Sequence, residues 1–218
     1  MNGWMYRCAI IENPGTDEEI STLADPETLK LTGEGVPEPV TMHEIGSAND
    51  LTDALEKVSD GSWNAHDLRL TANIDYSLPI TLSGCSLTVD LNGHTLTVQP
   101  DRTAQPNVAP MSSTAEIAAV YAAHFSWLKL TGDGALNVIA GDGIDYGVYA
   151  GTGSNVKVNA VTSAGGSKAV YATGDGAVTV DSITVAGDNA YGAGCFDSSN
   201  IKVSGDVKLR VFPLMACI

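Results

Sequence analysis

The sequence predicts an all-β chain that coils as a parallel β-helix, on three observations. Four similar tripeptides recur at spacings of 28, 22 and 20 residues: Val120-Tyr121-Ala122, Val148-Tyr149-Ala150, Val170-Tyr171-Ala172 and Ala190-Tyr191-Gly192. Apolar and polar residues alternate with a period of two from Leu68 onward, which is typical of strands with one buried face. Finally, 23 glycines accompany an aromatic content of only 6%, which favours short aliphatic strands joined by sharp turns.

Each repeat also carries two further apolar segments. The first is a short strand: Leu128-Lys129-Leu130, Val156-Lys157-Val158, Val178-Thr179-Val180 and Ile201-Lys202-Val203. The second is one apolar position: Val138, Val161, Ile183 and Val207. Three short strands in a repeat of about 22 residues predict a solenoid, because one rung buries its apolar face only by stacking on its neighbours about 4.8 Å away.

Glycine and aspartate between these strands are suited to the corners of the coil. The corner sequences are Gly132-Asp133-Gly134, Gly141-Asp142-Gly143, Gly174-Asp175-Gly176 and Gly187-Asp188-Asn189. Calcium binding is an alternative role for them, although they lack the regular nonapeptide spacing of calcium-binding β-rolls. No other cofactor is indicated, since the four cysteines form no CxxC pair.

One amphipathic helix is predicted near residues 49–60. Its apolar residues Leu51, Leu55 and Val58 recur at helical spacing, and Ser47 or Asn49 provides the N-cap. The open end of a β-coil exposes unpaired strand edges, so we expect this helix to cap the first rung of a coil spanning residues 44–218.

The residues before the coil predict a different unit. Residues 1–33 are expected to form a β-hairpin and residues 34–43 a Gly/Pro-rich linker. The segment Asn2-Gly3-Trp4-Met5-Tyr6-Arg7-Cys8 resembles strand F of immunoglobulin-like domains, in which a tyrosine lies two residues before a cysteine. An unrelated hairpin is the alternative. The resemblance implies that the chain begins inside another domain.

The start of the predicted coil resembles a known family. A helix ending in Asp60-Gly61 is followed by Leu68-Arg69-Leu70-Thr71-Ala72-Asn73-Ile74-Asp75 and then Leu87-Thr88-Val89-Asp90-Leu91-Asn92-Gly93-His94-Thr95-Leu96. This order resembles the opening of pectate-lyase-like parallel β-helices in large, adhesin-like surface proteins of gut bacteria. The resemblance implies a right-handed, single-stranded coil at the cell surface or outside the cell, alongside further domains of the same parent protein. The chain carries no signal peptide of its own.

Charge and hydropathy exclude two kinds of partner. The formal net charge of -15 disfavours nucleic acids, which would be repelled. No stretch of 18 or more apolar residues exists, so insertion into a membrane is not expected.

No catalytic residues are predicted. Enzymes with such a scaffold cleave polysaccharides with paired carboxylates, and the alternation places no two aspartates at matching strand positions of neighbouring rungs. Asp90 and His94 are either a catalytic pair or part of a turn, and the turn is favoured. We therefore expect a non-catalytic segment that serves as a stalk or as a weak carbohydrate-binding surface. A polysaccharide lyase or glycoside hydrolase, or a truncated fragment without an independent role, are the alternatives.

Two columns of side chains are the candidate ligand-binding residues. Tyr121, Tyr149, Tyr171 and Tyr191 are predicted to project from one face, where a polysaccharide or host glycan could lie on their rings. Lys129, Lys157 and Lys202 are predicted to form an outward column on the neighbouring sheet, suited to anionic glycans. Structural stacking of the tyrosines, or their pointing inward, and a solubilising role for the lysines are the alternatives. For Trp127, His124 and Phe125, packing is favoured over a groove.

Overall fold

The chain divides into two compact units, Met1–Pro39 and Val40–Ile218. The computed structural model describes residues 42–63, 67–101, 117–165, 167–186 and 191–210, all in the second unit. The predicted hairpin of residues 1–33, with its immunoglobulin-like motif, lies outside the described residues, as does all but the end of the linker predicted at 34–43. Both remain predictions.

The second unit is mostly β, with one helix, α2 (Ala48–Ser59), and 16 strands among its described residues. The strands are β1 (Met42–Ile45), β2 (Asp67–Leu70), β3 (Ile74–Tyr76), β4 (Ile80–Ser83), β5 (Ser86–Asp90), β6 (His94–Val98), β7 (Ala118–Ala123), β8 (Trp127–Thr131), β9 (Gly134–Ala140), β10 (Tyr146–Ala150), β11 (Asn155–Ala164), β12 (Lys168–Ala172), β13 (Ala177–Ala186), β14 (Tyr191–Cys195), β15 (Asn200–Val203) and β16 (Val207–Arg210). β1 begins inside the stretch predicted as linker, and the single strand predicted from Leu68 to Ile74 is divided between β2 and β3.

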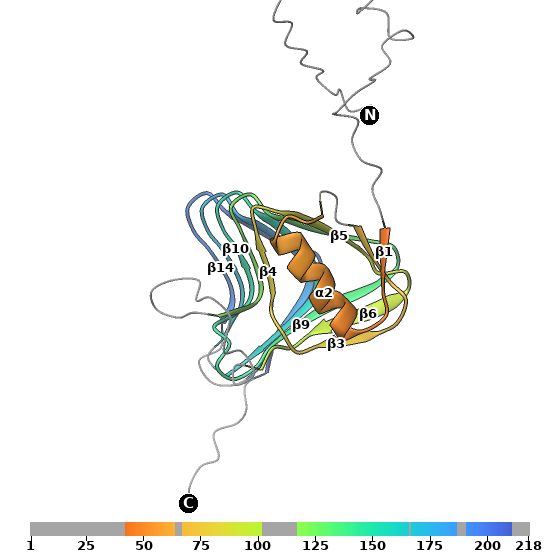
Figure 1. Ribbon diagram of the computed structural model, residues 1–218. Helices are drawn as coiled ribbons and strands as arrows, with labels where there is room; N and C mark the ends of the chain where they lie inside the picture. Colours follow the sequence, from red (N-terminus) through yellow and green to blue (C-terminus); the bar gives the residue numbers. More distant parts are fainter. Residues whose placement is uncertain (1–41, 64–66, 102–116, 166, 187–190, 211–218) are drawn as a thin grey trace, which may run out of the picture. The chain divides into compact units, whose positions relative to one another are not determined.

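The strands stack into three faces around a common core, and every described strand pair is parallel (Figure 1). The first face has the order β1-β2-β5-β8-β11-β13-β15, and the second has the order β3-β6-β9-β11-β13-β16. The third face, β4-β7-β10-β12-β14, is a separate five-stranded sheet. The first two faces form one sheet because β11 and β13, of ten residues each, run through both. The prediction of an all-β parallel solenoid is confirmed.

Aliphatic side chains from equivalent positions of successive rungs form the core. The four predicted apolar positions pair in register, with Val138 beside Val161, Val161 beside Ile183, and Ile183 beside Val207. The short strands of the repeat also pair as predicted, through Leu128, Val156, Val178 and Ile201. This register confirms the length of the repeat.

The corners between faces are stacked as well. At the corner from the third face to the first, four turns each contain two residues in the left-handed region: His124-Phe125, Thr152-Gly153, Gly174-Asp175 and Asp197-Ser198. Backbone hydrogen bonds join one turn to the next, for example from Phe125 N to Thr152 O and from Gly153 N to Gly174 O. These turns therefore extend the hydrogen bonding of the sheets around the corner.

Three of the predicted Gly-Asp corner sequences are turns, but at three different corners. Residues 132–134 follow β8, residues 141–143 follow β9, and residues 174–176 follow β12. Their aspartates therefore do not form one column along the coil. Residues 187–189 lie outside the described part of the chain.

Helix α2 covers the first end of the coil (Figure 1). The Ser47 hydroxyl accepts a hydrogen bond from Asp50 N at 3.2 Å, so Ser47 is the N-cap. Leu51, Leu55 and Val58 are buried in the core, which confirms the predicted cap. The Tyr76 hydroxyl lies 3.3 Å from the Thr52 hydroxyl and joins β3 to the helix.

Candidate functional site

Three of the four predicted tyrosines form one column on the outside of the third face. Tyr121 pairs with Tyr149, and Tyr149 pairs with Tyr171, in β7, β10 and β12. Their ring centroids are 5.2 and 5.8 Å apart, and each pair of rings is stacked. Val120 and Ala122, which flank Tyr121, are buried, so the tyrosines point outward as predicted.

Tyr191 does not continue this column, and its predicted place is wrong. Tyr191 at the start of β14 pairs with Lys168, whereas Gly194 is the residue opposite Tyr171. The tripeptide Ala190-Tyr191-Gly192 matches the others in sequence but lies three residues away from the equivalent position. Tyr191 is 61% exposed and stands beside the column.

Phe196 extends the column instead. Its ring is tilted against that of Tyr171, with the centroids 5.5 Å apart, and its side chain is 57% exposed. Gly194, the residue opposite Tyr171 in β14, has no side chain that could stack on Tyr171. The Phe196 ring contacts Tyr171 in its place. We call Tyr121, Tyr149, Tyr171 and Phe196 the aromatic strip.

Tyr146 and Lys168 support one side of the aromatic strip, and neither was predicted from the sequence. The Tyr146 ring lies edge-on to Tyr149, with the centroids 5.5 Å apart, and contacts Tyr171 at 5.1 Å. Lys168 Nζ lies 4.5 Å from the centroid of the Tyr146 ring and 5.7 Å from that of Tyr171. This geometry is that of a cation–π contact.

A break in the strand alternation brings Tyr146 to this side. Gly147 faces inward, where a Cβ atom would meet the Ala169 carbonyl oxygen and a Val161 methyl group, and the next residue, Val148, is buried as well. Tyr146 and Tyr149 therefore point the same way although they are three residues apart. The same break occurs in β7 and β12, where the consecutive residues Ala119-Val120 and Ala169-Val170 are also buried, so it is a property of this face and does not require the glycine.

Neighbouring tyrosine rings of the aromatic strip are stacked with an offset, so each covers only part of the next. Interplanar angles of 18 and 19° at centroid distances above 5 Å indicate offset stacking. Each tyrosine is half-buried, and burial raises the pKa of Tyr121. The strip therefore offers part of each ring face and the ring edges to solvent, so it is a shallow surface.

The predicted lysine column lies on the outside of the first face. Lys157 pairs with Thr179, which pairs with Lys202, and the pairing of Val156 with Leu128 brings Lys129 beside Lys157. All three lysines are exposed, and none has an ion pair with a carboxylate of the described residues. The column is a strip of unpaired positive charge.

Two aromatic residues beside the lysine column are exposed. Trp127 is 54% and Phe125 72% exposed, so the prediction that they pack into the protein is wrong. Trp127 lies two residues before Lys129 in β8 and faces the same side. Phe125 rests on Gly153, at a corner.

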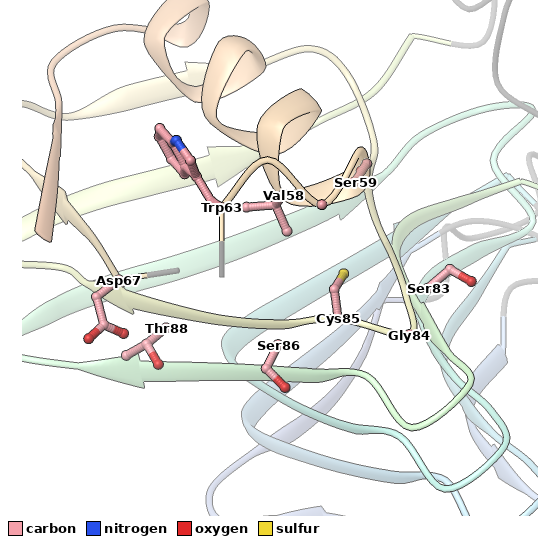
Figure 2. A pocket seen from close by; sticks show the side chains of 10 residues that line it. Val58, Ser59, Trp63, Asp67, Ser83, Gly84, Cys85, Ser86 and Thr88 are labelled. Atoms are coloured by element: carbon pink, nitrogen blue, oxygen red, sulfur yellow. The ribbon is translucent and has the colours of Figure 1, made fainter. Parts of the chain in front are cut away.

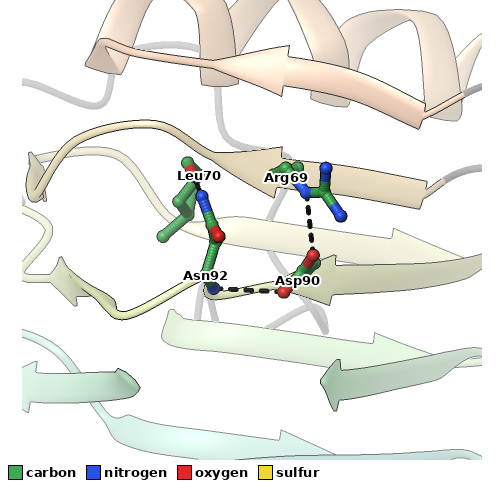
Figure 3. Close-up of polar contacts among 4 residues, drawn as sticks. All are labelled: Arg69, Leu70, Asp90 and Asn92. Carbon is green, nitrogen blue, oxygen red and sulfur yellow. Dashed lines mark hydrogen bonds and ion pairs between the residues drawn. The ribbon is translucent and has the colours of Figure 1, made fainter. Parts of the chain in front are cut away.

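Asp90 is held in a structural network rather than presented to solvent (Figure 3). One carboxylate oxygen lies 2.9 Å from Arg69 Nε, and the other accepts a hydrogen bond from Asn92 N at 3.1 Å. The Asn92 side chain donates to Leu70 O at 2.9 Å. Asn92 and Gly93 both have positive φ, at 48 and 79°. The turn interpretation of this segment is therefore favoured over the catalytic one.

A pocket lies where the end of α2 meets β2, β4 and β5 (Figure 2). Trp63, Asp67, Ser83, Cys85 and Ser86 are among its lining residues. Burial raises the pKa of the Cys85 thiol, which disfavours the reactive thiolate. The Ser83 hydroxyl lies 3.0 Å from His124 Nδ1, but among the described residues no carboxylate hydrogen-bonds to that imidazole.

Metal-binding clusters and membrane-spanning helices were both sought in the described ranges. No group of three or more His, Cys, Asp or Glu side chains is placed to hold a metal ion. The one helix of this part of the chain is too short and too polar to cross a bilayer.

Comparisons with known proteins identify no relative. No protein-family model matches the chain, and neither a curated protein nor a solved structure is significantly similar to it.

The network around Asp90 predicts a loss of stability when its carboxylate is removed. Asp90→Ala leaves Arg69 and the Asn92 N–H without their partner, and we expect the free energy of unfolding to fall by about 1–3 kcal/mol. Urea unfolding followed by circular dichroism measures this change. Asp133 is exposed and lies in the equivalent turn of the next rung. Asp133→Ala is therefore the control and should change stability by about 0.5 kcal/mol or less. Equal effects of the two substitutions would contradict the structural role of Asp90.

Proposed function

We propose that this chain is a non-catalytic, right-handed parallel β-helix segment of an exported bacterial surface protein, and that its aromatic strip binds carbohydrate weakly. One observation carries the proposal: four aromatic rings follow one another along the outside of a single face. Single exposed aromatic residues are common on proteins, but a continuous row of them is not a requirement of the core.

The chemistry of the strip suits a sugar polymer. Tyrosine offers an apolar ring for the C–H face of a sugar and a hydroxyl for its polar groups. The rings succeed one another at 5.2 to 5.8 Å along the coil, so an extended oligosaccharide would lie along the axis and contact several rungs. The offset overlap covers part of each ring, and we therefore expect each contact to be weak and the affinity to rise with chain length.

The lysine column adds a second contact surface for anionic glycans. Lys129 and Lys157 are neighbours without a carboxylate partner in the described part of the chain, and Trp127 is exposed beside them. Two adjacent like charges repel each other, and a sulfate or carboxylate between them relieves that repulsion. The whole chain has a net charge of -15, so the lysine column is a locally positive region on a negatively charged protein.

The handedness and the cellular location are parts of the same proposal. About 98% of crossover connections between parallel strands of one sheet are right-handed, which supports a right-handed coil. The order of helix, strands and Gly-rich corners, which resembles that of bacterial surface proteins, supports a stalk at the cell surface that carries further domains. The role of Asp90 in a turn gives no support to a lyase or hydrolase on this scaffold.

Substitutions in the aromatic strip test carbohydrate binding. We expect the full chain to bind at least one class of oligosaccharide on a glycan array, and Tyr149→Ala and Tyr171→Ala each to weaken that binding about three- to tenfold, since each removes one stacking contact. Tyr191→Ala, which removes an exposed tyrosine outside the strip, is the matched control and should leave binding unchanged. Binding that survives both strip substitutions would remove the strip from the proposal. Release of reducing or unsaturated sugar ends by the chain would contradict the non-catalytic role.

The lysine column makes a separate prediction about salt and charge. Lys129→Ala combined with Lys157→Ala should lower the affinity for sulfated or carboxylated glycans about tenfold, and binding of neutral glycans should not change. Isothermal titration at low and high salt measures both effects, because screening weakens exposed charge pairs. Lys208→Ala removes an exposed lysine outside the column and is the control. An equal loss of neutral and anionic ligands would mean that the column does not select charge.

A further inference from the structure

The strands of the third face carry a single charged side chain. The five described strands β4, β7, β10, β12 and β14 contain one charged residue, Lys168 at the start of β12. The first face, in contrast, has Asp67 and Asp90 in its strands, and the second face has Asp75. The chain as a whole has a net charge of -15, so an acidic ligand meets less repulsion over the strands of the third face.

Lys168 lies beside the aromatic strip and not in the core. Ala118 and Tyr146 occupy the equivalent position of the two preceding rungs, and both are buried, at 3% and 5% exposure. Lys168 is partly exposed at this position. The next two residues of β12 are both buried, so Lys168 points to the same side of the sheet as Tyr171, three residues later. Its charge therefore lies at the margin of the strip, where the packing of the core does not require one.

Two tyrosine rings hold the ammonium group in place. Lys168 Nζ lies 4.5 Å from the centroid of the Tyr146 ring and 5.7 Å from that of Tyr171, and it donates a hydrogen bond to the Tyr146 hydroxyl at 3.4 Å. In the described ranges, no carboxylate forms an ion pair with Lys168. Asp145, next to Tyr146 in the chain, instead accepts a hydrogen bond from Ile117 N at 2.8 Å. The ammonium group is thus fixed in position and retains N–H donors for an anion.

From these observations we propose that Lys168 makes the aromatic strip selective for acidic sugars. The inference rests on the proposed function of the strip and names its class of ligand, an oligosaccharide with a carboxylate or sulfate group at the edge of a sugar ring. A sugar ring stacked on Tyr171 extends its substituents sideways, within reach of Nζ. The acidic group accepts charge-assisted hydrogen bonds from an ammonium group that two rings already position, so little side-chain freedom is lost on binding.

This selectivity is separate from that of the lysine column. The lysines of the column are exposed on the first face, in β8, β11 and β15, whereas Lys168 belongs to β12 of the third face. The combination of Lys129→Ala, Lys157→Ala and Lys202→Ala removes the column and leaves the strip intact. This column-free variant therefore isolates the charge preference of the strip.

The test compares oligosaccharides with and without their acidic groups. The probes are hexasaccharides that contain hexuronic acid, each paired with the same molecule after its carboxyl groups are reduced to alcohols. Isothermal titration of the column-free variant should show about three- to tenfold tighter binding of the acidic form at low salt, and high salt should remove this preference. A sulfate ester of the carboxyl-reduced form distinguishes the two anions: tight binding extends the class to sulfated sugars, and weak binding restricts it to carboxylated ones.

Substitutions of Lys168 in the column-free variant assign the preference to this residue. Lys168→Gln removes the charge but keeps a hydrogen-bonding group beside Tyr146. It should abolish the preference for the acidic form and leave binding of the carboxyl-reduced form unchanged. Lys168→Arg keeps the positive charge and should retain the preference. Lys208→Ala removes an exposed lysine outside both surfaces and is the matched control. Circular dichroism confirms that the variants are folded.

Three results would overturn the inference and leave the proposed function in place. Equal binding of the acidic and reduced forms by the column-free variant would show that the strip does not select charge. A preference that survives Lys168→Gln would place the selectivity elsewhere. An equal loss of both forms in Lys168→Gln would mean that the lysine only supports the tyrosine rings. Failure of the unsubstituted chain to bind either form at millimolar concentrations would instead contradict the proposed function and, with it, this inference.

Discussion

The structure depends on the in-register stacking of successive rungs. Each rung is too short to bury its aliphatic side chains alone, and the parallel backbone pairing places equivalent residues over one another. A slip of one residue would turn the whole core column of a strand toward solvent, so burial of Val138, Val161 and Ile183 fixes the register strongly. The stacked left-handed turns at the corners have the same register.

This constraint also determines the surface of the molecule. When the core residues of a strand are fixed, the residues between them form outward columns, and any residue type that recurs in the repeat becomes a strip along the coil. The aromatic strip and the lysine column are two such strips, on different faces. The core column itself continues from Ile183 to Val207, which is 55% exposed.

The features that arise directly from the repeat could be predicted from the sequence. The Val-Tyr-Ala tripeptides and the apolar positions predicted the rungs and the outward tyrosines, and helical spacing predicted the capping helix with Ser47 among its possible N-caps. The features that could not be predicted depend on departures from the period. Tyr191 matched the tripeptide by sequence but lies three residues from the equivalent position, and two consecutive inward residues, Gly147 and Val148, bring Tyr146 to the same side as Tyr149. Such shifts are decided by packing against the neighbouring rung.

A pair of engineered cysteines tests the register most directly. Thr162 and Thr184 are opposite each other in β11 and β13, and Cα atoms of neighbouring strands lie about 4.8 Å apart, within the range that a disulfide bridges. Thr162→Cys with Thr184→Cys should therefore form a disulfide on mild oxidation with oxidised glutathione, detected by peptide mass mapping. Thr162→Cys with Ser182→Cys, two residues out of register, should remain reduced. Disulfide formation in the second pair but not in the first would contradict the stacking on which the fold depends.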